Sequence, residues 1–529
     1  MAQVSDEKIF QSFLQRGYLP EVLPPIFTSK KWATGLAGKE IAIDLPKEVE
    51  LQKISYSCTK RGYGRRYFDF VHPASAVSTS AWMSRHWKDI ESFCSSTQTA
   101  PTQTALEESK DNRCIVSCSF DRVLKEAKER LAGARYIVRA DVAKYYSSIY
   151  THAISWALNG KDAAKQDRGT YSKKVFGNEF DWAIRIGQGN QTKGIPVGPD
   201  FSRAAGEVVG TAIDKLVLEK IDSRHIGYVR NIDDFYIGAH DLASAEAILH
   251  ALQESLRAYE LELNDDKTSI KEASTLIDDS WIHELDLLLN STPSETSKGI
   301  NRAFDRAFYY ASNVGSDSAL KYLVRTVDTL TSSDDLEFDE VEHSLVRSLV
   351  SYPHCVDYCI LLFLKQHALG NANTKLWRDV ICRELTRHLS SSHDHEASWL
   401  LTAIVGAEIK VGKLSLTPDP NRQITNTLLL HCLDSGLVEF DGNSFIDEVA
   451  PNSEVNSNWL LCNEVISNAW VTKAARDRIA RHRKIVVGKD ISFLNPNFLL
   501  DLDSEEGRRA IPDRYNRYDD RTGEEEIEI

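Results

Sequence analysis

The sequence has no run of about 18 consecutive apolar residues, the length that a membrane-spanning helix needs. It also lacks paired CxxC motifs. The nine cysteines are scattered, and the closest pairs are spaced by one helical turn. This spacing argues against a zinc site and favours buried free thiols in a reducing compartment. The first ten residues do not follow the basic-then-apolar order of a secretory signal, so we expect a cytoplasmic protein.

An overall basic charge, the usual mark of a nucleic-acid-binding protein, is also missing, because the net charge is −14. The charge is unevenly distributed along the chain. Residues 51–180 contain 21 Lys and Arg against 13 Asp and Glu, whereas residues 501–529 contain 5 against 11. A basic groove is therefore compatible with an acidic total. A length of 529 residues predicts two or three domains.

Strand-like and helix-like segments alternate from residue 135 to about residue 270, which predicts an α+β sheet layer of the split βαβ kind. In chain order they are a strand at 136–138, a helix at 201–221, two strands around a polar tip at 226–237, a helix at 248–256, and strand-like segments at 261–263 and 268–270.

After about residue 290 the strand signals end and long amphipathic helices follow. Turn-like breaks near 353, 390–392 and 434–436 recur at roughly 40-residue intervals, the period of two-helix repeat units. An irregular helical bundle is the alternative. The last residues are polar and acidic, and we expect them to be extended or disordered.

Two adjacent carboxylates, Asp233 and Asp234, lie at the polar tip between the two strands of 226–237. Like charges side by side among β-forming residues are unfavourable unless a cation neutralises them. Oxygen ligands suit Mg²⁺, and two such ions can hold the attacking and leaving oxygens of a phosphoryl transfer. For the pair alone, an Asp-Asp turn in an ordinary hairpin is the alternative.

Further candidate residues precede this pair. A strand ends at Asp141, which could bridge two metal ions with Asp233, while the Val142 carbonyl could complete the coordination shell. Tyr146 would occupy the place of a ribose 2′-hydroxyl, so its bulk would favour deoxynucleotides. A core aromatic residue is the alternative for Tyr146.

The loop at 191–199 separates these motifs and contains Lys193, Gly194 and Pro196. Its two glycines and two prolines predict a fixed loop over which a base pair or template strand can pass. Downstream, Lys267 could donate to the leaving pyrophosphate or position the triphosphate, although a surface lysine is the alternative. These signals in one order predict a nucleotide-polymerising site.

Other candidates lie outside these motifs. Arg61, Arg65 and Arg66 with Tyr63 and Tyr67 could hold triphosphate or template, or could form a solvated basic face.

His152 and Trp156 are expected to pack the core. Tyr515 and Tyr518 lie in the polar tail and are candidate protein primers, because a tyrosine hydroxyl can attack an α-phosphate. Apolar strands do not flank Tyr518-Asp519-Asp520, which excludes that triplet as the active site.

The motifs resemble those of a known family. Asp141 with Tyr146, the GIPVGP loop at 194–199 and the IDDF hairpin at 232–235 resemble motifs A, B and C of reverse transcriptases, and residues 264–270 resemble the segment that follows their palm helix.

More narrowly, the stretch SIYTHAISWALNGK at 148–161 is similar to bacterial antiphage reverse transcriptases of the abortive-infection and defence-associated group. Residues 16–27 also resemble the N-terminus of that group. Two departures are Asn231, where the family usually has Tyr or Phe, and Lys193, where Gln is common. The helical half is similar in character to the HEAT-like repeat domain of the abortive-infection branch.

The resemblance implies an α+β fingers-palm polymerase of the reverse transcriptase-like fold, followed by an all-α HEAT-like helical repeat domain. The implied parts are an N-terminal and fingers region at 1–125, a palm with the catalytic motifs at 126–290, helical repeats at 291–490, and an acidic tail at 491–529.

The resemblance also implies a function. It is that of a bacterial enzyme with two Mg²⁺ ions that makes a DNA product from dNTPs during phage infection. Such enzymes copy a noncoding RNA or extend DNA without a template, often form homo-oligomers, and in several cases start from a protein side chain. The alternatives are an RNA polymerase on the same palm, which Tyr146 argues against, and a non-catalytic sensor of nucleic acid or phage protein that uses the helical half.

Overall fold

The structure is a computed structural model. It describes residues 6–38, 51–60, 64–101, 104–107, 113–116, 118, 120–167, 174–221, 224–275, 280–290, 296–314, 318–332, 336–450, 458–482 and 492–498. None of the helices in these ranges is long and apolar enough to cross a membrane. All nine cysteines are free thiols, and seven of them are buried, as the sequence predicts.

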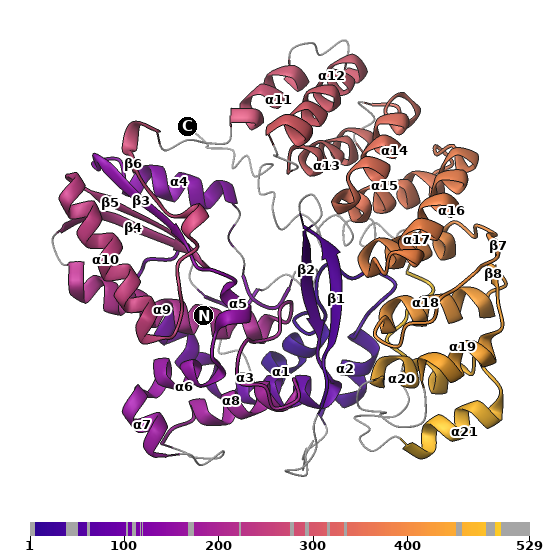
Figure 1. The fold of residues 1–529 in the computed structure, drawn as a ribbon, viewed down its shortest axis with the longest axis horizontal. Coiled ribbons are helices and arrows are strands. Elements are labelled where there is room, and N and C mark those ends of the chain that lie inside the picture. Colours follow the sequence, from indigo (N-terminus) through magenta and orange to yellow (C-terminus); the bar gives the residue numbers. More distant parts are fainter. Residues whose placement is uncertain are drawn as a thin grey trace.

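The N-terminal region combines helices with a two-stranded antiparallel hairpin that the sequence pattern did not predict. Ile54 lies opposite Phe70 and Thr59 opposite Arg65 in this hairpin. Figure 1 shows the hairpin between the palm sheet and a long stack of helices. The elements are α1 (Asp6–Gln15), α2 (Lys30–Leu36), β1 (Ile54–Thr59), β2 (Arg65–Phe70) and α3 (Pro73–Cys94).

The palm sheet has four antiparallel strands in the order β4-β5-β3-β6. The prediction of strands near 136–138, 226–237 and 268–270 is confirmed, whereas residues 261–263 form only a single bridge, between Leu263 and Val142. The strands are β3 (Tyr136–Asp141), β4 (His225–Asn231), β5 (Asp234–Ala239) and β6 (Ser269–Glu272).

Helices cover both faces of this sheet. Side chains alternate along each strand, so Ile137, Val229 and Tyr236 pack against α4 while Val138 and Ile237 join the main core with α9 and α10. The predicted helices at 201–221 and 248–256 are confirmed as α9 and α10. The palm helices are α4 (Phe120–Arg130), α5 (Tyr145–Ser148), α6 (Thr151–Asn159), α7 (Lys161–Gln166), α8 (Gly177–Ile186), α9 (Asp200–Ile221) and α10 (Leu242–Ala258).

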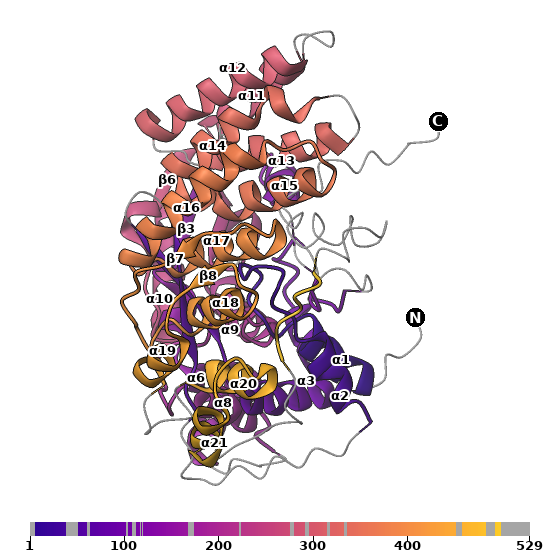
Figure 2. The same cartoon turned by 90° about the vertical axis from the view of Figure 1, so that its right-hand side faces the viewer.

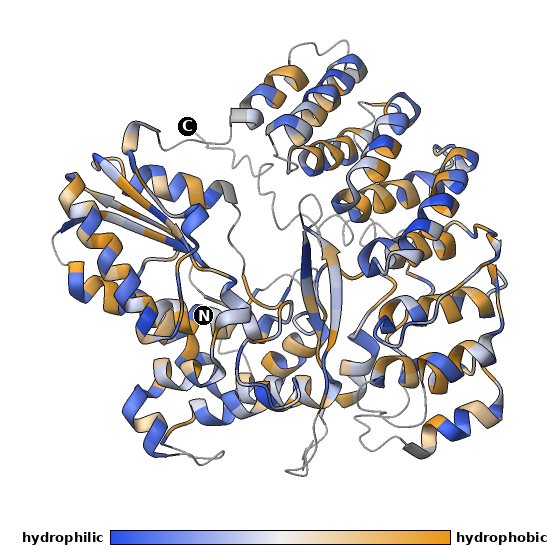
Figure 3. Cartoon of the chain, viewed as in Figure 1, coloured by the Kyte–Doolittle hydropathy of each residue, from blue (hydrophilic) through white to orange (hydrophobic). Residues whose placement is uncertain are grey.

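The second half is a curved stack of helices that runs along the side of the polymerase-like half (Figures 1 and 2). Most of these helices carry both polar and apolar residues (Figure 3), and their apolar side chains form the buried core. They are α11 (Ser280–Asn290), α12 (Thr296–Tyr309), α13 (Ser318–Ser332), α14 (Glu342–Ser351), α15 (Val356–Ala368), α16 (Thr374–Ser390), α17 (Asp394–Gly406), α18 (Gln423–Asp434), α19 (Gly442–Val449), α20 (Trp459–Asn468) and α21 (Lys473–His482).

The expectation that strands end at residue 290 needs one correction. A short parallel pair, β7 (Gly412–Lys413) and β8 (Val438–Glu439), joins the loops that flank α18. Each strand has only two residues, which is too short for a detectable alternation of polar and apolar side chains.

The chain returns to its own beginning after α21. The Thr28 amide donates to the Phe493 carbonyl at 2.7 Å, and the Asn495 amide donates to the Ile26 carbonyl at 2.7 Å. Phe493 is buried among aromatic rings that include Tyr18 and Phe70. The expected flexible tail at 491–529 therefore began too early, because apolar side chains in 492–498 complete the N-terminal core.

Candidate active site

Asp141 and Asp234 end two neighbouring strands at the same edge of the palm sheet. They are direct cross-strand partners in the antiparallel register of β3 and β5, so their side chains lie on one face of the sheet. That face is covered by α4 at Ile137, but Arg139 is already exposed. Of the two carboxylates, Asp141 is buried and Asp234 is partly exposed.

Asp233 lies in the two-residue turn between β4 and β5, since Asn231 pairs with Asp234 on either side of it. Its carbonyl accepts a hydrogen bond from the Val142 amide at 3.2 Å, which ties the turn to the residue after Asp141. Three carboxylates that are distant in the sequence therefore meet at one corner of the sheet.

The other residue of this turn, Ile232, has a backbone φ of 58°. Glycine is favoured at the first position of a hairpin turn in which only that residue has a positive φ. A β-branched residue there is strained, at a cost of about 1–3 kcal/mol. Surrounding contacts must hold the turn in place.

The electrostatics of this corner fit a cation. Burial and then the negative charges of Asp234 and Asp141 raise the pKa of Asp233 to about 6. Burial and the charge of Asp141 also raise the pKa of Asp234. A group of half-buried oxygens that repel one another is the donor set that divalent ions such as Mg²⁺ stabilise. Asp141, Asp233 and Asp234 would hold such ions.

Lys267 and Asn264 lie next to Asp141. The Lys267 ammonium contacts one carboxylate oxygen of Asp141 at 2.6 Å, and the Asn264 side-chain amide donates to the other oxygen at 3.0 Å. The Lys267 side chain is 56% exposed, so it can also reach a bound phosphate. The fold thus places Lys267 beside Asp141, and its predicted role toward the triphosphate stays a prediction.

The loop at 191–199 is fixed against the segment that follows Asp141. The Ile195 amide donates to the Tyr146 carbonyl at 2.8 Å, and Gly194 has a φ of 84° with a Cβ position only 3.1 Å from the Ser147 carbonyl oxygen. A side chain at Gly194 would be strained and would push this contact apart. Lys193 is exposed beside Gly194, while Pro196 is buried.

Tyr146 packs against α9. A Cβ added at Gly206 would lie 3.2 Å from the Tyr146 ring, so the missing side chain of Gly206 makes room for that ring. The neighbouring Tyr145 hydroxyl donates to the Gly206 carbonyl at 2.7 Å. Tyr146 is partly buried.

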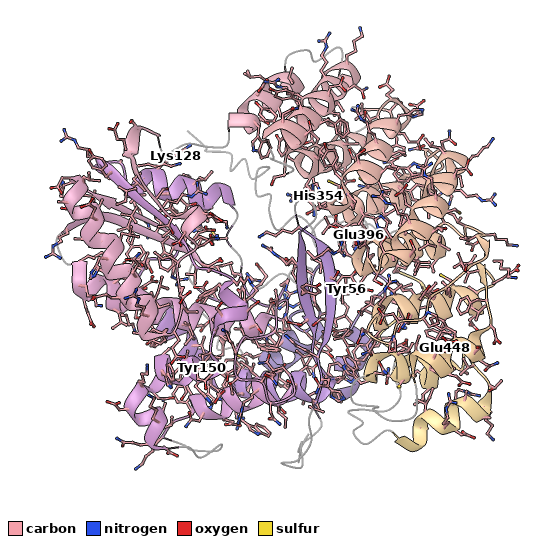
Figure 4. The ribbon with its side chains drawn as sticks, viewed as in Figure 1. Tyr56, Lys128, Tyr150, His354, Glu396 and Glu448 are labelled. Carbon is pink, nitrogen blue, oxygen red and sulfur yellow. The ribbon has the colours of Figure 1, made fainter. Side chains whose placement is uncertain are left out.

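Arg65 requires a correction. The sequence placed it with triphosphate or template, but its guanidinium binds both oxygens of Glu396 on α17, at 2.7 and 3.0 Å. Figure 4 shows Glu396 beside Tyr56, where the hairpin meets the helical stack. The ion pair with the buried Glu396 carboxylate occupies the Arg65 guanidinium, which therefore does not face a substrate. Arg66 and Tyr67 on the same strand remain exposed.

The remaining predicted residues divide into two groups. His152 contacts Asp181 at 2.6 Å and Trp156 is 7% exposed, in agreement with a packing role. Arg61, Tyr63 and the candidate primers Tyr515 and Tyr518 lie outside the described residues.

The sequence reasoning missed a buried charge network under the turn. Arg230 is 1% exposed and contacts Asp214 at 2.8 Å and Glu207 at 3.1 Å, both on α9. An acidic pair at i, i+7 on α9 and a lone arginine on β4 were the sequence signals, and neither is specific.

A second missed group lies at the contact between the hairpin and the stack. Ligand atoms of His388, His393 and Glu396 all lie within 4.8 Å of one another. Burial lowers the pKa of His388 to about 4, and the two imidazole Nδ1 atoms are 2.9 Å apart. Both oxygens of Glu396 are already bound by Arg65, so this group is best described as a polar junction.

Comparisons with known proteins agree with the geometry of the palm. Residues 81–301 match the family described as reverse transcriptase (RNA-dependent DNA polymerase). A search of curated proteins found no match.

Three of the solved structures with similarity to this chain are telomerases. They are apo telomerase from Candida tropicalis truncated from its C-terminal domain (TM-score 0.29, 11% identity, covering 45% of this chain and 53% of that one), telomerase from Candida albicans in complex with a TWJ fragment of telomeric RNA (0.29, 12%, 67% and 65%), and apo telomerase from Candida tropicalis (0.32, 12%, 69% and 66%). The chain thus spans 53% to 66% of the length of these proteins.

The family match covers β3, β4 and β5 together with α9 and α10, and therefore all three carboxylates. Residues 81–301 accordingly carry a reverse transcriptase domain, the enzyme domain of RNA-directed DNA polymerases in the nucleotidyltransferase class.

Proposed function

We propose that this protein polymerises dNTPs into DNA with two Mg²⁺ ions at Asp141, Asp233 and Asp234. The observation that carries this proposal is the cross-strand pairing of Asp141 with Asp234 beside Asp233, at the open edge of the palm sheet. Reverse transcriptase domains bind nucleotides and nucleic acid, and this corner offers the acidic ligands that metal-assisted phosphoryl transfer needs.

Each residue of the site would have a separate role in nucleotide addition. Bound Mg²⁺ would stabilise the charge on the attacking and leaving oxygens. Tyr146 would exclude a ribose 2′-hydroxyl, and the loop around Gly194 would guide the base pair. Lys267 would exchange its contact with Asp141 for the leaving pyrophosphate and could donate a proton to it. Arg66 and Lys193, both exposed, would contact phosphates of the triphosphate or template.

Primer extension with purified protein tests this proposal. The wild type should incorporate dNTPs in Mg²⁺, and Asp233→Asn should lose about three orders of magnitude in rate, which corresponds to several kcal/mol of charge stabilisation. Asp305→Asn, in an exposed carboxylate of the helical stack, should retain activity. Preferential incorporation of NTPs by the wild type would instead identify an RNA polymerase on this palm.

The biological setting that we propose is bacterial antiphage defence, with the stacked helices acting as a HEAT-like repeat domain. The support is the similarity of residues 148–161 and 16–27 to the abortive-infection and defence-associated group. Phage plating on cells that express the protein tests it. Protection should disappear with Asp233→Ala/Asp234→Ala. Full protection by that variant would favour a non-catalytic sensor.

The primer and template also belong to this proposal. Sequencing of co-purified nucleic acid would distinguish copying of a noncoding RNA from untemplated extension, and phenol partitioning would show covalent attachment to protein. If Tyr515 or Tyr518 is the primer, Tyr515→Phe/Tyr518→Phe should release the product from the protein. Persistent attachment in that variant would exclude both tyrosines. Size-exclusion chromatography with light scattering tests the proposed homo-oligomer.

A further inference from the structure

One buried arginine supports the turn that carries Asp233. Arg230 lies on β4, two residues before Ile232, and is 1% exposed. Its Nη1 donates to the Ile232 carbonyl at 3.1 Å. Since Ile232 is the strained residue of the turn, this bond acts on the part of the backbone that most needs support.

The same guanidinium is anchored on α9. Its Nε donates to Asp214 at 2.8 Å, and its Nη2 donates to Glu207 at 3.1 Å. A guanidinium is planar and presents its donors in fixed directions, so these two bonds also fix the direction of the third. Lysine offers one point of charge and cannot reproduce all three directions.

Asp214 is itself held by several hydrogen bonds. It is 0% exposed and accepts hydrogen bonds from the Thr99 hydroxyl at 2.5 Å and the Tyr228 hydroxyl at 2.7 Å, in addition to Arg230. The Thr99 carbonyl in turn accepts from the Arg230 amide at 3.0 Å. The anchor is therefore well fixed, because Asp214 on α9 is bonded both to β4, through Tyr228 and Arg230, and to the segment of Thr99.

The helix face that receives the arginine is shaped for it. A Cβ at Gly210 would lie 2.7 Å from Arg230 Nη1, so the absent side chain leaves the space that the guanidinium fills. One turn earlier on the same face, Gly206 receives Tyr145 and Tyr146. One face of α9 thus contacts the segment after Asp141 and the hairpin of Asp233.

We propose that Arg230 is a positioning residue that couples α9 to the metal-binding turn, holding Ile232 and Asp233 in the geometry that binds the divalent ions. The expected effect on kcat rests on the proposed function. The expected effects on metal binding and on amide exchange of the turn do not, because both are measured without nucleotide.

The test compares Arg230→Lys with Arg422→Lys. Arg422 is a matched control because it is 5% exposed, bonds Asp394 at 2.9 Å and donates to the Leu389 carbonyl at 2.9 Å, but lies in the helical stack. Glu207→Gln is a milder second variant that removes one anchor of Arg230 and leaves Asp214 in place. The measurements are Mn²⁺ binding by electron paramagnetic resonance, amide exchange of residues 229–236, and kcat with KM for dNTP.

We expect Arg230→Lys to weaken Mn²⁺ binding and lower kcat by about 10- to 100-fold each, as small displacements of catalytic groups do, with little change in KM. Exchange in the turn should accelerate, and Glu207→Gln should change all three in the same direction by less. Equal losses in Arg422→Lys, or wild-type metal binding in folded Arg230→Lys, would overturn the proposal. If Arg230→Lys does not fold, unchanged metal binding and exchange in Glu207→Gln would overturn it.

If the wild type binds Mn²⁺ but polymerises nothing, the proposed function fails while the metal and exchange measurements still decide the role of Arg230.

Discussion

Arg65 and Glu396, 331 residues apart, form a two-point ion pair in which each guanidinium Nη atom donates to a different carboxylate oxygen. The Glu396 side chain is 0% exposed. Thr59 on the adjacent strand also contacts this carboxylate, and Tyr56 and Ser398 share a hydrogen bond nearby. The hairpin next to the palm is therefore fastened to the middle of the helical stack.

Loss of one partner should be costly. Glu396→Gln leaves the partly buried guanidinium of Arg65 without its counter-charge, so we expect a loss of about 3 kcal/mol in the free energy of unfolding. Denaturant titration measures it. Glu254→Gln, in an exposed pair with Lys220, should lose much less stability, because solvent screens that pair. Arg65→Met/Glu396→Met should be more stable than Glu396→Gln, and a double variant as unstable as the sum of both singles would contradict a direct pair.

The same pair predicts a pH dependence of stability. Burial raises the pKa of Glu396, but hydrogen bonds and charge from Arg65, together with the charge of His395, lower it to about 2. A carboxyl whose pKa is lower in the folded state stabilises the fold at pH above its unfolded value, and this contribution is lost as pH falls through the folded value. The loss should therefore occur between about pH 4.5 and pH 2.

Unfolding midpoints measured across that window in the wild type and Glu396→Gln check this prediction. The wild type should lose more stability than the variant as the pH falls. Parallel curves would show that Glu396 is not the group responsible.

Divalent ions should stabilise the folded protein in the absence of nucleotide. The carboxylates of Asp233 and Asp234 are unfavourably charged in the folded state, since burial and mutual repulsion raise the pKa of both. At 100 times its dissociation constant, one bound ion adds about 2.7 kcal/mol. A thermal-shift titration with Mg²⁺ should raise the midpoint of the wild type but not that of Asp233→Asn/Asp234→Asn. An equal rise in both proteins would place the binding elsewhere.

Tyr146 should control the choice of sugar. Truncation to alanine removes the ring that rests on Gly206 and opens space there. We expect Tyr146→Ala to raise the ratio of NTP to dNTP incorporation by about 10- to 100-fold, the range of a single steric contact. Tyr146→Phe keeps the ring and should keep the discrimination. Competition assays with matched ATP and dATP give the ratio, and an unchanged ratio in Tyr146→Ala would assign the selection to another residue.

The palm was predictable because its signals are local. Short apolar runs predict strands β3, β4 and β5, and the helical periodicity of apolar residues predicts α9 and α10. The carboxylate corner followed from the order of Asp141 and the Asp233–Asp234 pair, since antiparallel pairing brings the ends of such strands together.

The remainder depended on contacts that local patterns do not encode. The hairpin of β1 and β2 buries Tyr56 against α17, whose own pattern says nothing about its partner. Arg65 looks like a substrate residue until Glu396 is brought beside it by the fold. The positive φ of Ile232 breaks the residue preference for its turn, so a preference-based prediction cannot anticipate it.

Residues 493–495 pair with the segment around Phe27, and this pairing has a consequence for folding during translation. During translation, the aromatic cluster of Tyr18, Trp32 and Phe70 emerges from the ribosome long before Phe493 does. We therefore expect nascent chains ending at residue 491 to bind a hydrophobic dye and to be cleaved readily by protease, unlike chains ending at 498. Chains that stop before residue 493 would therefore lack this part of the core and would not fold fully.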